Sequence, residues 1–302
     1  MKTIDLFAGL GGFSTGASMA GADVVWAGNH WPAAVALHQR NHPSAIHVCQ
    51  DLQQADWSQV PNHDVMLASP ACQGHSRAKG ARNGPAQDLS RSTAWAVVSA
   101  AEIKRPRTIV VENVPEFLTW SLFPAWSEAM KALGYHLVSQ VIDAADHGVP
   151  QNRRRLFVVA NQRRALWPTL PRRAHVPASS IIVDDGARWS AVDRPGRAAA
   201  TLARVEAGRA VHGQRFLMAF YGNASGGRSL DRPIGTITTR DRYALVDGDK
   251  MRMLSAKEYA GAMGFPSTTI LPDSHKTAVH MLGNAVCPPV ARDLVAEIMR
   301  AA

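Results

Sequence analysis

The chain has 302 residues, of which 46% are hydrophobic and 19% are charged. This balance is ordinary for a folded protein and excludes a disordered chain. The three cysteines, Cys49, Cys72 and Cys287, have no metal-ligand spacing, which argues against a disulfide framework or metal site and favours a reducing compartment. No apolar run approaches the roughly 18 residues of a membrane span, and the N-terminus lacks a signal-peptide pattern. We therefore expect a cytoplasmic protein with no membrane partner and no metal.

The formal net charge of +9 is concentrated in one segment. Residues 151–250 contain 18 Lys and Arg, 17 of them Arg, against 8 Asp and Glu, a net charge of +10. The rest of the chain is nearly neutral. Arginine guanidinium groups suit phosphates and base edges because they donate two parallel hydrogen bonds. Charge alone leaves a nucleic-acid partner and a solubilising surface equally open.

Strands and helices alternate over the first 160 residues. Strands are expected at 3–7, 23–27, 47–49, 65–68, 108–112, 136–142 and 156–160. Helices are expected at 13–20, 32–41, 92–104 and 124–133. This alternation predicts an α/β fold with a doubly wound, mostly parallel sheet.

A glycine-rich turn, Ala8-Gly9-Leu10-Gly11-Gly12, follows the first expected strand. Its glycines allow a ligand to approach the backbone, and the helix N-terminus offers N–H groups to a carboxylate or phosphate. Ser14 stands where the dinucleotide pattern has its third glycine, which disfavours a nicotinamide cofactor.

Polar and aromatic residues follow the next two strands. Asn29 and His30 are candidates for binding ribose hydroxyls, and Trp31 is suited to stacking on a purine. Asp51 and Leu52 end the third strand, where a carboxylate suits an adenine amino group. Each residue alone is better explained as structural. Their arrangement at successive strand ends favours a bound adenosine.

A single cysteine and a single acid stand at two further strand ends. Cys72 follows the apolar run Val65–Ala68 and a Pro-containing turn. A lone cysteine is more often a buried core residue, and the alternative is a nucleophile displayed at the sheet edge. Glu112 ends the apolar strand Ile109–Val111, where an acid is costly unless it is used or paired.

Five motifs occur in an order that resembles bacterial-type DNA (cytosine-5)-methyltransferases, over about residues 3–160 and 232–300. They are DLFAGLGGF at 5–13, Cys72-Gln73, ENV at 112–114, Q-x-R-x-R at Gln151, Arg153 and Arg155, and GNAV at 283–286. The resemblance implies the S-adenosylmethionine-dependent methyltransferase fold, with a second, smaller, irregular β-rich domain. It also lowers the odds that Cys72 is a core residue.

The reaction that the resemblance implies transfers a methyl group from S-adenosylmethionine to carbon 5 of a flipped-out cytosine in a short sequence of double-stranded DNA. Cys72 would add to carbon 6 and make carbon 5 nucleophilic. Glu112 would donate to ring N3, Arg155 would hold O2 and Arg153 would support the site.

Cofactor and DNA contacts follow from the same resemblance. S-adenosylmethionine would contact Phe7, Ala8, Gly9, Leu10, Gly11, His30, Trp31, Asp51, Leu52, Asn284 and Val286. DNA would contact Ser76, Arg77, Lys79, Thr236, Arg240 and Arg242. The first three belong to segment 73–90, which we expect to close over the bound DNA. Further candidates for reading neighbouring bases are Arg188, Arg197, Arg204 and Arg228. His30 replaces the glutamate usual in the family, which leaves the ribose contact open.

The sequence predicts a catalytic and cofactor-binding domain at 1–164, a target-recognition domain at 165–280, and a segment at 281–302 that returns to the catalytic domain. β-prone runs at 181–183, 216–221 and 234–238 suggest strands in the second domain. A capping box at Ser255 and Glu258 predicts a helix ending near Met263, and a final helix is expected at 288–299. We expect a monomer, because the recognition segment lies in the same chain, and leave a cognate restriction endonuclease open.

Two alternatives remain. The first is a transfer-RNA cytosine methyltransferase on the same scaffold, although that relative's Cys-Phe-Thr tripeptide is absent and the basic segment favours a duplex. The second is a catalytically silent DNA-binding relative, against which the presence of Cys72 and Glu112 argues.

Overall fold

The computed structural model describes residues 1–71, 93–183, 188–221 and 226–301. They form two compact units. The first unit is Met1–Ala144 with Arg154–Arg172 and Ala285–Ala302, and the second is Ala145–Arg153 with Arg173–Asn284. The chain therefore passes between the units at four places, whereas the division drawn from the sequence has two boundaries.

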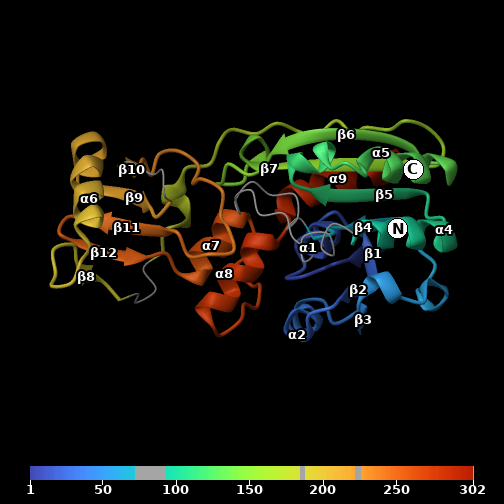
Figure 1. Ribbon diagram of the computed structural model, residues 1–302, viewed down its shortest axis with the longest axis horizontal. Coiled ribbons are helices and arrows are strands. Elements are labelled where there is room, and N and C mark those ends of the chain that lie inside the picture. Colours follow the sequence, from blue (N-terminus) through green and yellow to red (C-terminus); the bar gives the residue numbers. More distant parts are fainter. Residues whose placement is uncertain (72–92, 184–187, 222–225, 302) are drawn as a thin grey trace. The chain divides into compact units, whose positions relative to one another are not determined.

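The first unit is built on a seven-stranded sheet of order β3-β2-β1-β4-β5-β7-β6 (Figure 1). Its strands are β1 Lys2–Leu6, β2 Asp23–Asn29, β3 Ile46–Cys49, β4 Val65–Ala68, β5 Thr108–Asn113, β6 His136–Asp143 and β7 Arg154–Asn161. Strands β1 to β5 pair in parallel, and β7 runs antiparallel to both β5 and β6. The doubly wound, mostly parallel sheet expected from the sequence is confirmed.

Helices pack on this sheet. They are α1 Gly12–Met19, α2 Pro32–Asn41, α4 Trp95–Lys104, α5 Phe123–Ala132 and α9 Pro288–Arg300, with short 3-10 helices η1 Leu52–Gln54, η2 Trp57–Gln59 and η4 Pro115–Thr119. A further 3-10 helix, η5 Ala144–His147, begins in the first unit and continues into the second. Successive strand residues point to opposite faces. In β1, Ile4 and Leu6 join the core formed with α4 and α5, while Asp5 bonds Ser14 in α1.

Helix α1 packs against the start of α9 with almost no space between them. A Cβ atom on Gly12 would lie 2.1 Å from the Val286 carbonyl oxygen. A Cβ atom on Gly16 would lie 2.4 Å from Cβ of Ala291. These two glycines let the N-terminal helix and the C-terminal segment lie in direct contact within the first unit.

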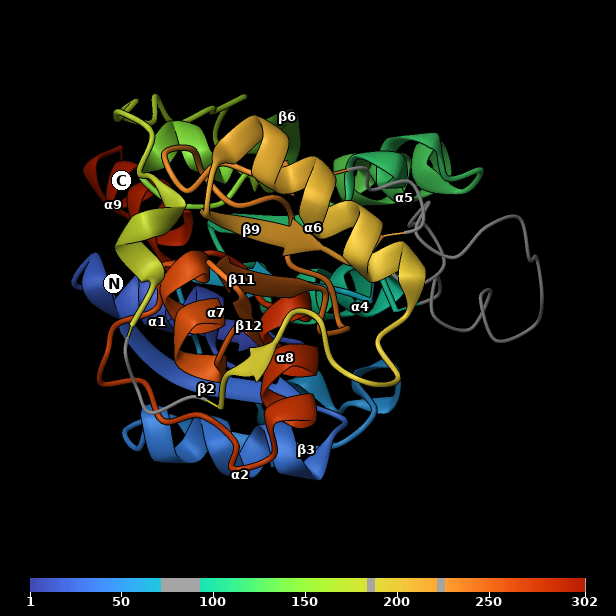
Figure 2. The same ribbon diagram turned by 90° about the vertical axis from the view of Figure 1, so that its left-hand side faces the viewer.

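The second unit contains an antiparallel five-stranded sheet of order β10-β9-β11-β12-β8. Its strands are β8 Ser190–Ala191, β9 Arg215–Ala219, β10 Gly227–Arg228, β11 Tyr243–Asp247 and β12 Lys250–Met253. Helix α6, Ala199–His212, lies over β9 (Figure 2), where Val205 packs on Phe216 in a small apolar core. The expectation of a second, smaller, β-rich domain is confirmed.

Helices α7 Ala256–Met263 and α8 His275–Asn284 complete the second unit. The predicted capping box is present, since Ser255 and Glu258 bond each other's backbone N–H groups. Two expected strands are wrong. Segment 181–183 begins at the last residue of a 3-10 helix, η6 Ala178–Ile181, which starts after Pro177. Segment 234–238 makes only one isolated bridge, between Ile234 and Gln151, because side chains take up its backbone groups.

Membrane spans, metal-binding clusters and cysteine pairing can be examined directly in the structure. Within the described ranges, no helix combines the length and hydropathy needed to cross a membrane. The same residues contain no group of three or more His, Cys, Asp or Glu side chains arranged to hold a metal ion. Cys49 is an exposed free thiol and Cys287 a buried one.

Candidate active site

Sheet topology gathers the predicted site residues of the first unit at one edge. The carboxyl ends of the parallel strands β1 to β5 lie at this edge, and antiparallel β7 begins there. The segments that follow or begin these strands are Phe7–Gly11, His30–Trp31, Asp51–Leu52, Pro70–Ala71, Glu112–Asn113 and Arg155. Open α/β sheets bind ligands at this edge.

Glu112 and Arg155 form an ion pair at the edge. Arg155 Nε lies 3.1 Å from Glu112 Oε1, and the two side chains are 17% and 8% exposed. Their strands, β5 and β7, are hydrogen-bonded neighbours. Arg155 also donates from Nη1 to the Arg154 carbonyl. A buried carboxylate beside a guanidinium is suited to recognising a planar ring that offers both donors and acceptors.

The backbone just before Cys72 is held at the same edge. Asn113 Nδ2 donates to the Pro70 carbonyl at 3.2 Å, and the Ala71 N–H donates to Thr93 Oγ1 at 3.1 Å. Cys72 itself, with Ser76, Arg77 and Lys79, lies outside the described residues. Their predicted roles, like closure of segment 73–90, remain predictions.

The turn after β1 has an unusual backbone. Phe7 has a φ of 62°, and Gly9 and Gly11 have φ of 56° and 91°. A non-glycine residue in this left-handed region costs about 1 to 3 kcal/mol and is concentrated at functional sites. The Ala8 N–H donates to the Gly28 carbonyl, which ties the turn to β2. A Cβ atom on Gly9 would meet nothing closer than 3.8 Å, so the backbone here is open to a ligand.

The N-terminus of α1 is already partly occupied. Asp5 Oδ2 accepts hydrogen bonds from the Ser14 N–H at 3.1 Å and from Ser14 Oγ at 2.7 Å. This helix end therefore offers fewer free donors than the sequence suggested. Asp5 is 1% exposed, and burial raises the pKa of its carboxyl to about 7.

A chain of polar contacts continues from Asp5 on β1 to His47 on β3, two residues that the strand register places at the same level of the sheet. His38 Nε2 lies 3.0 Å from Ser14 Oγ, and His38 Nδ1 lies 2.8 Å from His47 Nε2. Burial, with a smaller contribution from the neighbouring imidazoles, lowers the pKa of His38 to about 2 and that of His42 to about 4. These rings remain neutral at physiological pH and support the glycine turn, since a Cβ atom on Gly11 would lie 2.9 Å from His42 Nε2.

The remaining cofactor candidates lie beside one another on β2 and β3, whose ends pair Asn29 with Cys49. Asn29 Oδ1 accepts a hydrogen bond from the N–H of Trp31, the residue just before α2, so the Asn29 side chain is already bonded to the backbone. His30 is exposed. Asp51 is also exposed and caps η1 by accepting from the Gln53 N–H.

The Q-x-R-x-R pattern divides between the two units. Gln151 and Arg153 are buried in the second unit, and Arg155 belongs to the first. Arg153 donates to the carbonyls of Ile237 at 3.0 Å and Gly283 at 2.9 Å. Gln151 accepts from the Ile237 N–H and donates to the Ala262 carbonyl. Both residues therefore organise the backbone of the second unit, a role that spacing alone did not reveal for Gln151.

The predicted DNA-contacting residues of the second unit lie on segment 234–242. Thr236 Oγ1 donates to the Asn152 carbonyl. Arg242 donates to the Phe220 carbonyl and lies over the Tyr221 ring. Arg240 is exposed. Elsewhere, Arg197 donates to the carbonyls of Val192 and Ala191 and to Ser190, which makes it a poor candidate for reading bases.

The GNAV motif also spans both units. Asn284 ends α8 in the second unit, where its Nδ2 lies 3.3 Å from His280 Nε2. Val286 is buried in the first unit, with its carbonyl against Gly12. Its position behind the glycine turn is that of a packing residue, and its predicted contact with a cofactor remains untested.

Comparison with known proteins identifies the family. A model of the C-5 cytosine-specific DNA methylase family matches residues 1–184 and 202–300. The chain therefore belongs to this family of DNA (cytosine-5-)-methyltransferases, and the resemblance seen in its motifs is confirmed.

Individual relatives agree. The chain is 28% identical to Type II methyltransferase M.NlaX of Neisseria lactamica over 100% of its own length and 96% of that protein. It is 30% identical to M.AgeI of Thalassovita gelatinovora over 61% of its own length, a match that spans 45% of M.AgeI. A prophage-encoded putative DNA modification methyltransferase from E. coli has the same fold, with a TM-score of 0.74 at 18% identity and 99% coverage of both chains. S. pombe Dnmt2 superposes with a TM-score of 0.69 at 17% identity, over 100% of this chain and 98% of that one.

Proposed function

We propose that this protein transfers a methyl group from S-adenosylmethionine to carbon 5 of a cytosine that is flipped out of double-stranded DNA. The observation that carries the proposal is the buried Glu112–Arg155 pair at the carboxyl edge of the sheet. Asn113, the neighbour of Glu112, bonds the backbone two residues before Cys72. The Glu112 carboxyl, the Arg155 guanidinium and the backbone that leads to Cys72 thus belong to the neighbouring strands β5, β7 and β4.

In the proposed mechanism the Cys72 thiolate forms a bond to carbon 6 of the cytosine. Protonated Glu112 donates to N3 as electrons move into the ring, and Arg155 holds O2. Carbon 5 would then form a bond to the methyl group as the bond from that group to the sulfur of S-adenosylmethionine breaks, and the N3 proton would return to Glu112. Removal of the carbon 5 proton returns electrons to the ring and expels the thiolate.

The first unit offers a fitting surface for S-adenosylmethionine, which supplies an electrophilic methyl group when bound. The left-handed turn at Phe7–Gly11 exposes backbone to a ligand, while His30, Trp31 and the Asp51 carboxylate follow the adjacent strands. An exposed carboxylate suits the amino and hydroxyl donors of an adenosine. His30 would bond a ribose hydroxyl through its imidazole ring in place of a carboxylate.

The type II names of the relatives suggest a role beside a restriction endonuclease. We propose that the chain acts as a monomer that protects cellular DNA at one short sequence, with the Arg-rich second unit reading that sequence.

Bisulfite sequencing tests the proposal. Wild type and Cys72→Ser are expressed in a host that lacks cytosine methylation, and genomic DNA and transfer RNA are both sequenced. We expect protected cytosines in one short DNA context, with wild type only. Protection of transfer RNA alone would establish the RNA alternative. A folded wild type that binds DNA without protecting it would establish the silent-binder alternative.

A further inference from the structure

Segment 234–243 carries the basic turn Thr238–Arg242 but contains no regular strand before β11 begins at Tyr243. Gln151 and Arg153 hold its first half through Ile237. A different set of side chains holds its second half, and the function of those side chains is not explained by the proposed chemistry.

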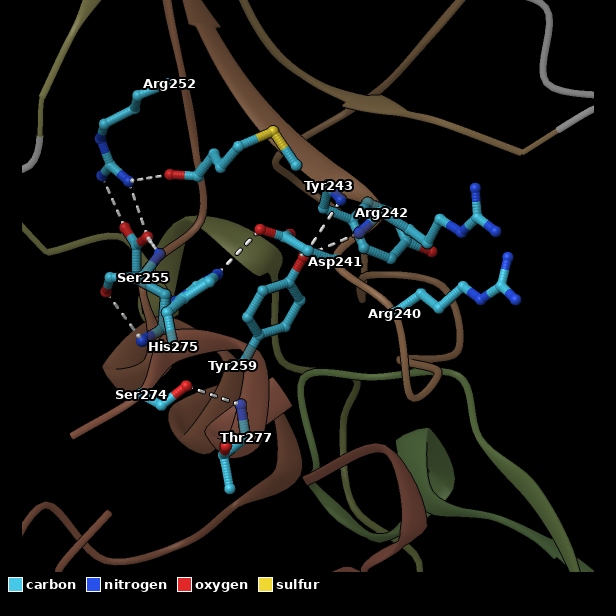
Figure 3. A network of polar contacts seen from close by, with 12 residues as sticks. Arg240, Asp241, Arg242, Tyr243, Arg252, Ser255, Tyr259, Ser274, His275 and Thr277 are labelled. Atoms are coloured by element: carbon cyan, nitrogen blue, oxygen red, sulfur yellow. Dashed lines mark hydrogen bonds and ion pairs between the residues drawn. The ribbon is translucent and has the colours of Figure 1, made fainter. Parts of the chain in front are cut away.

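Asp241, Tyr259 and His275 form this second set (Figure 3). Tyr259 of α7 is fully buried, and its hydroxyl donates to Asp241 Oδ1 at 2.6 Å. The same hydroxyl accepts from the N–H groups of Tyr243 at 3.1 Å and Arg242 at 3.3 Å. His275, the first residue of α8, lies with Nε2 2.8 Å from Asp241 Oδ2. Both oxygens of the Asp241 carboxylate are therefore engaged.

Helix α8 supports the turn from its other end as well. A Cβ atom on Gly283 would lie 2.3 Å from the Thr238 carbonyl carbon. The helix thus contacts the turn backbone through Gly283 and the Asp241 side chain through His275. The Thr239 nitrogen would lie 2.5 Å from the same Cβ atom, so the two fixed points on this helix leave Arg240 between them.

The two arginines that flank Asp241 differ. The Arg242 guanidinium is used on the Phe220 carbonyl and the Tyr221 ring. Arg240 is exposed, and no hydrogen bond or ion pair joins its side chain to another residue in the described part of the chain. In Figure 3 its side chain extends away from the Asp241, Tyr259 and His275 contacts.

We propose that Asp241, Tyr259 and His275 are positioning residues that hold the turn so that Arg240 contacts DNA, and that His275 offsets the charge of Asp241 beside that contact. This inference rests on the proposed function and names a device that sets its DNA affinity. A carboxylate next to a DNA-binding guanidinium repels phosphate unless a cation is paired with it. A purely structural turn would not need that compensation.

The pairing makes DNA affinity depend on pH. The hydrogen bond from Asp241 raises the pKa of His275, and partial burial opposes the rise. The ionisable groups that contact the imidazole are the Asp241 carboxylate and the Tyr259 phenol, and its chain neighbours include Asp273 and Lys276. Below the pKa of His275 the imidazolium cancels the charge of Asp241. Above it, the carboxylate is uncompensated, so affinity falls as pH rises.

Steady-state kinetics with unmethylated plasmid DNA and tritiated S-adenosylmethionine provide the test. We expect Arg240→Ala to raise the KM for DNA about tenfold with kcat within about twofold. Tyr259→Phe should raise KM about fivefold alone and add nothing in an Arg240→Ala background, because it acts through Arg240. His275→Gln keeps an N–H donor but not the charge, so its KM should lose the dependence on pH seen with wild type between pH 6 and 8.5.

The matched control is His175→Gln, which alters a similar His–carboxylate pair, with His175 Nε2 2.9 Å from Asp146 Oδ1. Its KM should stay at the wild-type value at every pH. Additive effects of Tyr259→Phe and Arg240→Ala on the KM for DNA would overturn the inference. A pH profile of the His275→Gln KM equal to that of wild type would overturn it as well. In either case, methylation by wild type would leave the proposed function intact. Should Tyr259→Phe fail to fold, the exposed His275 variant still decides. Failure of wild type to methylate plasmid DNA would overturn both.

Discussion

The two units position the side chains that we propose to be functional by different means. In the first unit, Glu112 and Arg155 take their places from neighbouring strands in a regular register. In the second, segment 234–242 depends on side-chain bonds from Gln151, Arg153 and Tyr259 to its backbone. Strand pairing is indifferent to most side chains, whereas each of these bonds requires one residue type. The second unit should therefore be the more sensitive to single substitutions.

The largest effect should come from the buried ion pair of the second unit. Arg252 donates two hydrogen bonds to Glu258 at 2.7 and 2.6 Å, and the side chains are 3% and 0% exposed. Arg252→Met should lower the free energy of unfolding by about 3 to 5 kcal/mol, because Glu258 is left as an uncompensated buried charge. Urea denaturation followed by circular dichroism measures this loss.

The control for that variant is Lys131→Met in the first unit, where Lys131 and Glu128 are 53% and 70% exposed. Its cost should stay below about 1 kcal/mol. Equal losses from both variants would remove the contrast between buried and exposed pairs.

Glu112→Gln should have the next largest effect, on rate and not on folding. The amide cannot deliver a proton to N3, so single-turnover methylation should slow by about 10² to 10³, a barrier increase of about 3 to 4 kcal/mol. Glu128→Gln, on an exposed helix, should leave the rate within about twofold. A Glu112→Gln enzyme of wild-type rate would show that the acid has no role in methyl transfer.

Because of His38, the free energy of unfolding should decrease as the pH is lowered below 6.5. Its pKa is about 2 in the folded protein and 6.5 in the unfolded chain, so the unfolded chain binds a proton below pH 6.5 that the folded protein does not. The contribution is fully present above pH 6.5 and decreases by about 2 kcal/mol by pH 5. Unfolding curves of wild type and His38→Gln at pH 5 to 8 check this: the variant should lose that part of the slope.

Two helical glycines give the smallest contrast. Gly16→Ala places a Cβ atom 2.4 Å from Cβ of Ala291 and should destabilise by about 1 to 3 kcal/mol through overpacking. Gly261→Ala meets Ile181 at an ordinary 3.7 Å and should stabilise by about 0.5 to 1 kcal/mol through helix propensity. Thermal unfolding of both variants measures these changes. Midpoints that moved in the same direction would contradict the prediction that the two substitutions have opposite effects on stability.

The contrast between the units also explains what could be predicted from the sequence. Short apolar runs between glycine turns and helices marked all seven strands of the first sheet. Their carboxyl ends then identified Glu112 and the glycine turn without knowledge of any contact. Arg155 followed from its motif, and its pairing with Glu112 needed the observed antiparallel β7.

The second unit was predicted less well, for physical reasons. Four of the five residues 234–238 are β-branched and the segment resembles a strand, yet Gln151 and Arg153 take the hydrogen bonds that a neighbouring strand would make. Asp241, Tyr259 and His275 come from a turn and two helices, so no periodic pattern links them. Helix α6 was missed because a segment rich in Pro and Arg was read as irregular and β-rich.

The four passages of the chain between the units have a consequence for recombination among relatives. Two of these passages, at Arg153–Arg154 and Asn284–Ala285, fall inside the Q-x-R-x-R and GNAV motifs. A crossover that exchanged the whole second unit would have to cut both motifs. An exchange that kept them would carry only the interior of the unit and leave Gln151, Arg153 and Gly283 with the recipient. If the second unit reads DNA as proposed, a change of sequence preference is therefore expected to be inherited as an insert between the two motifs, accepted only where the incoming turn fits the resident residues.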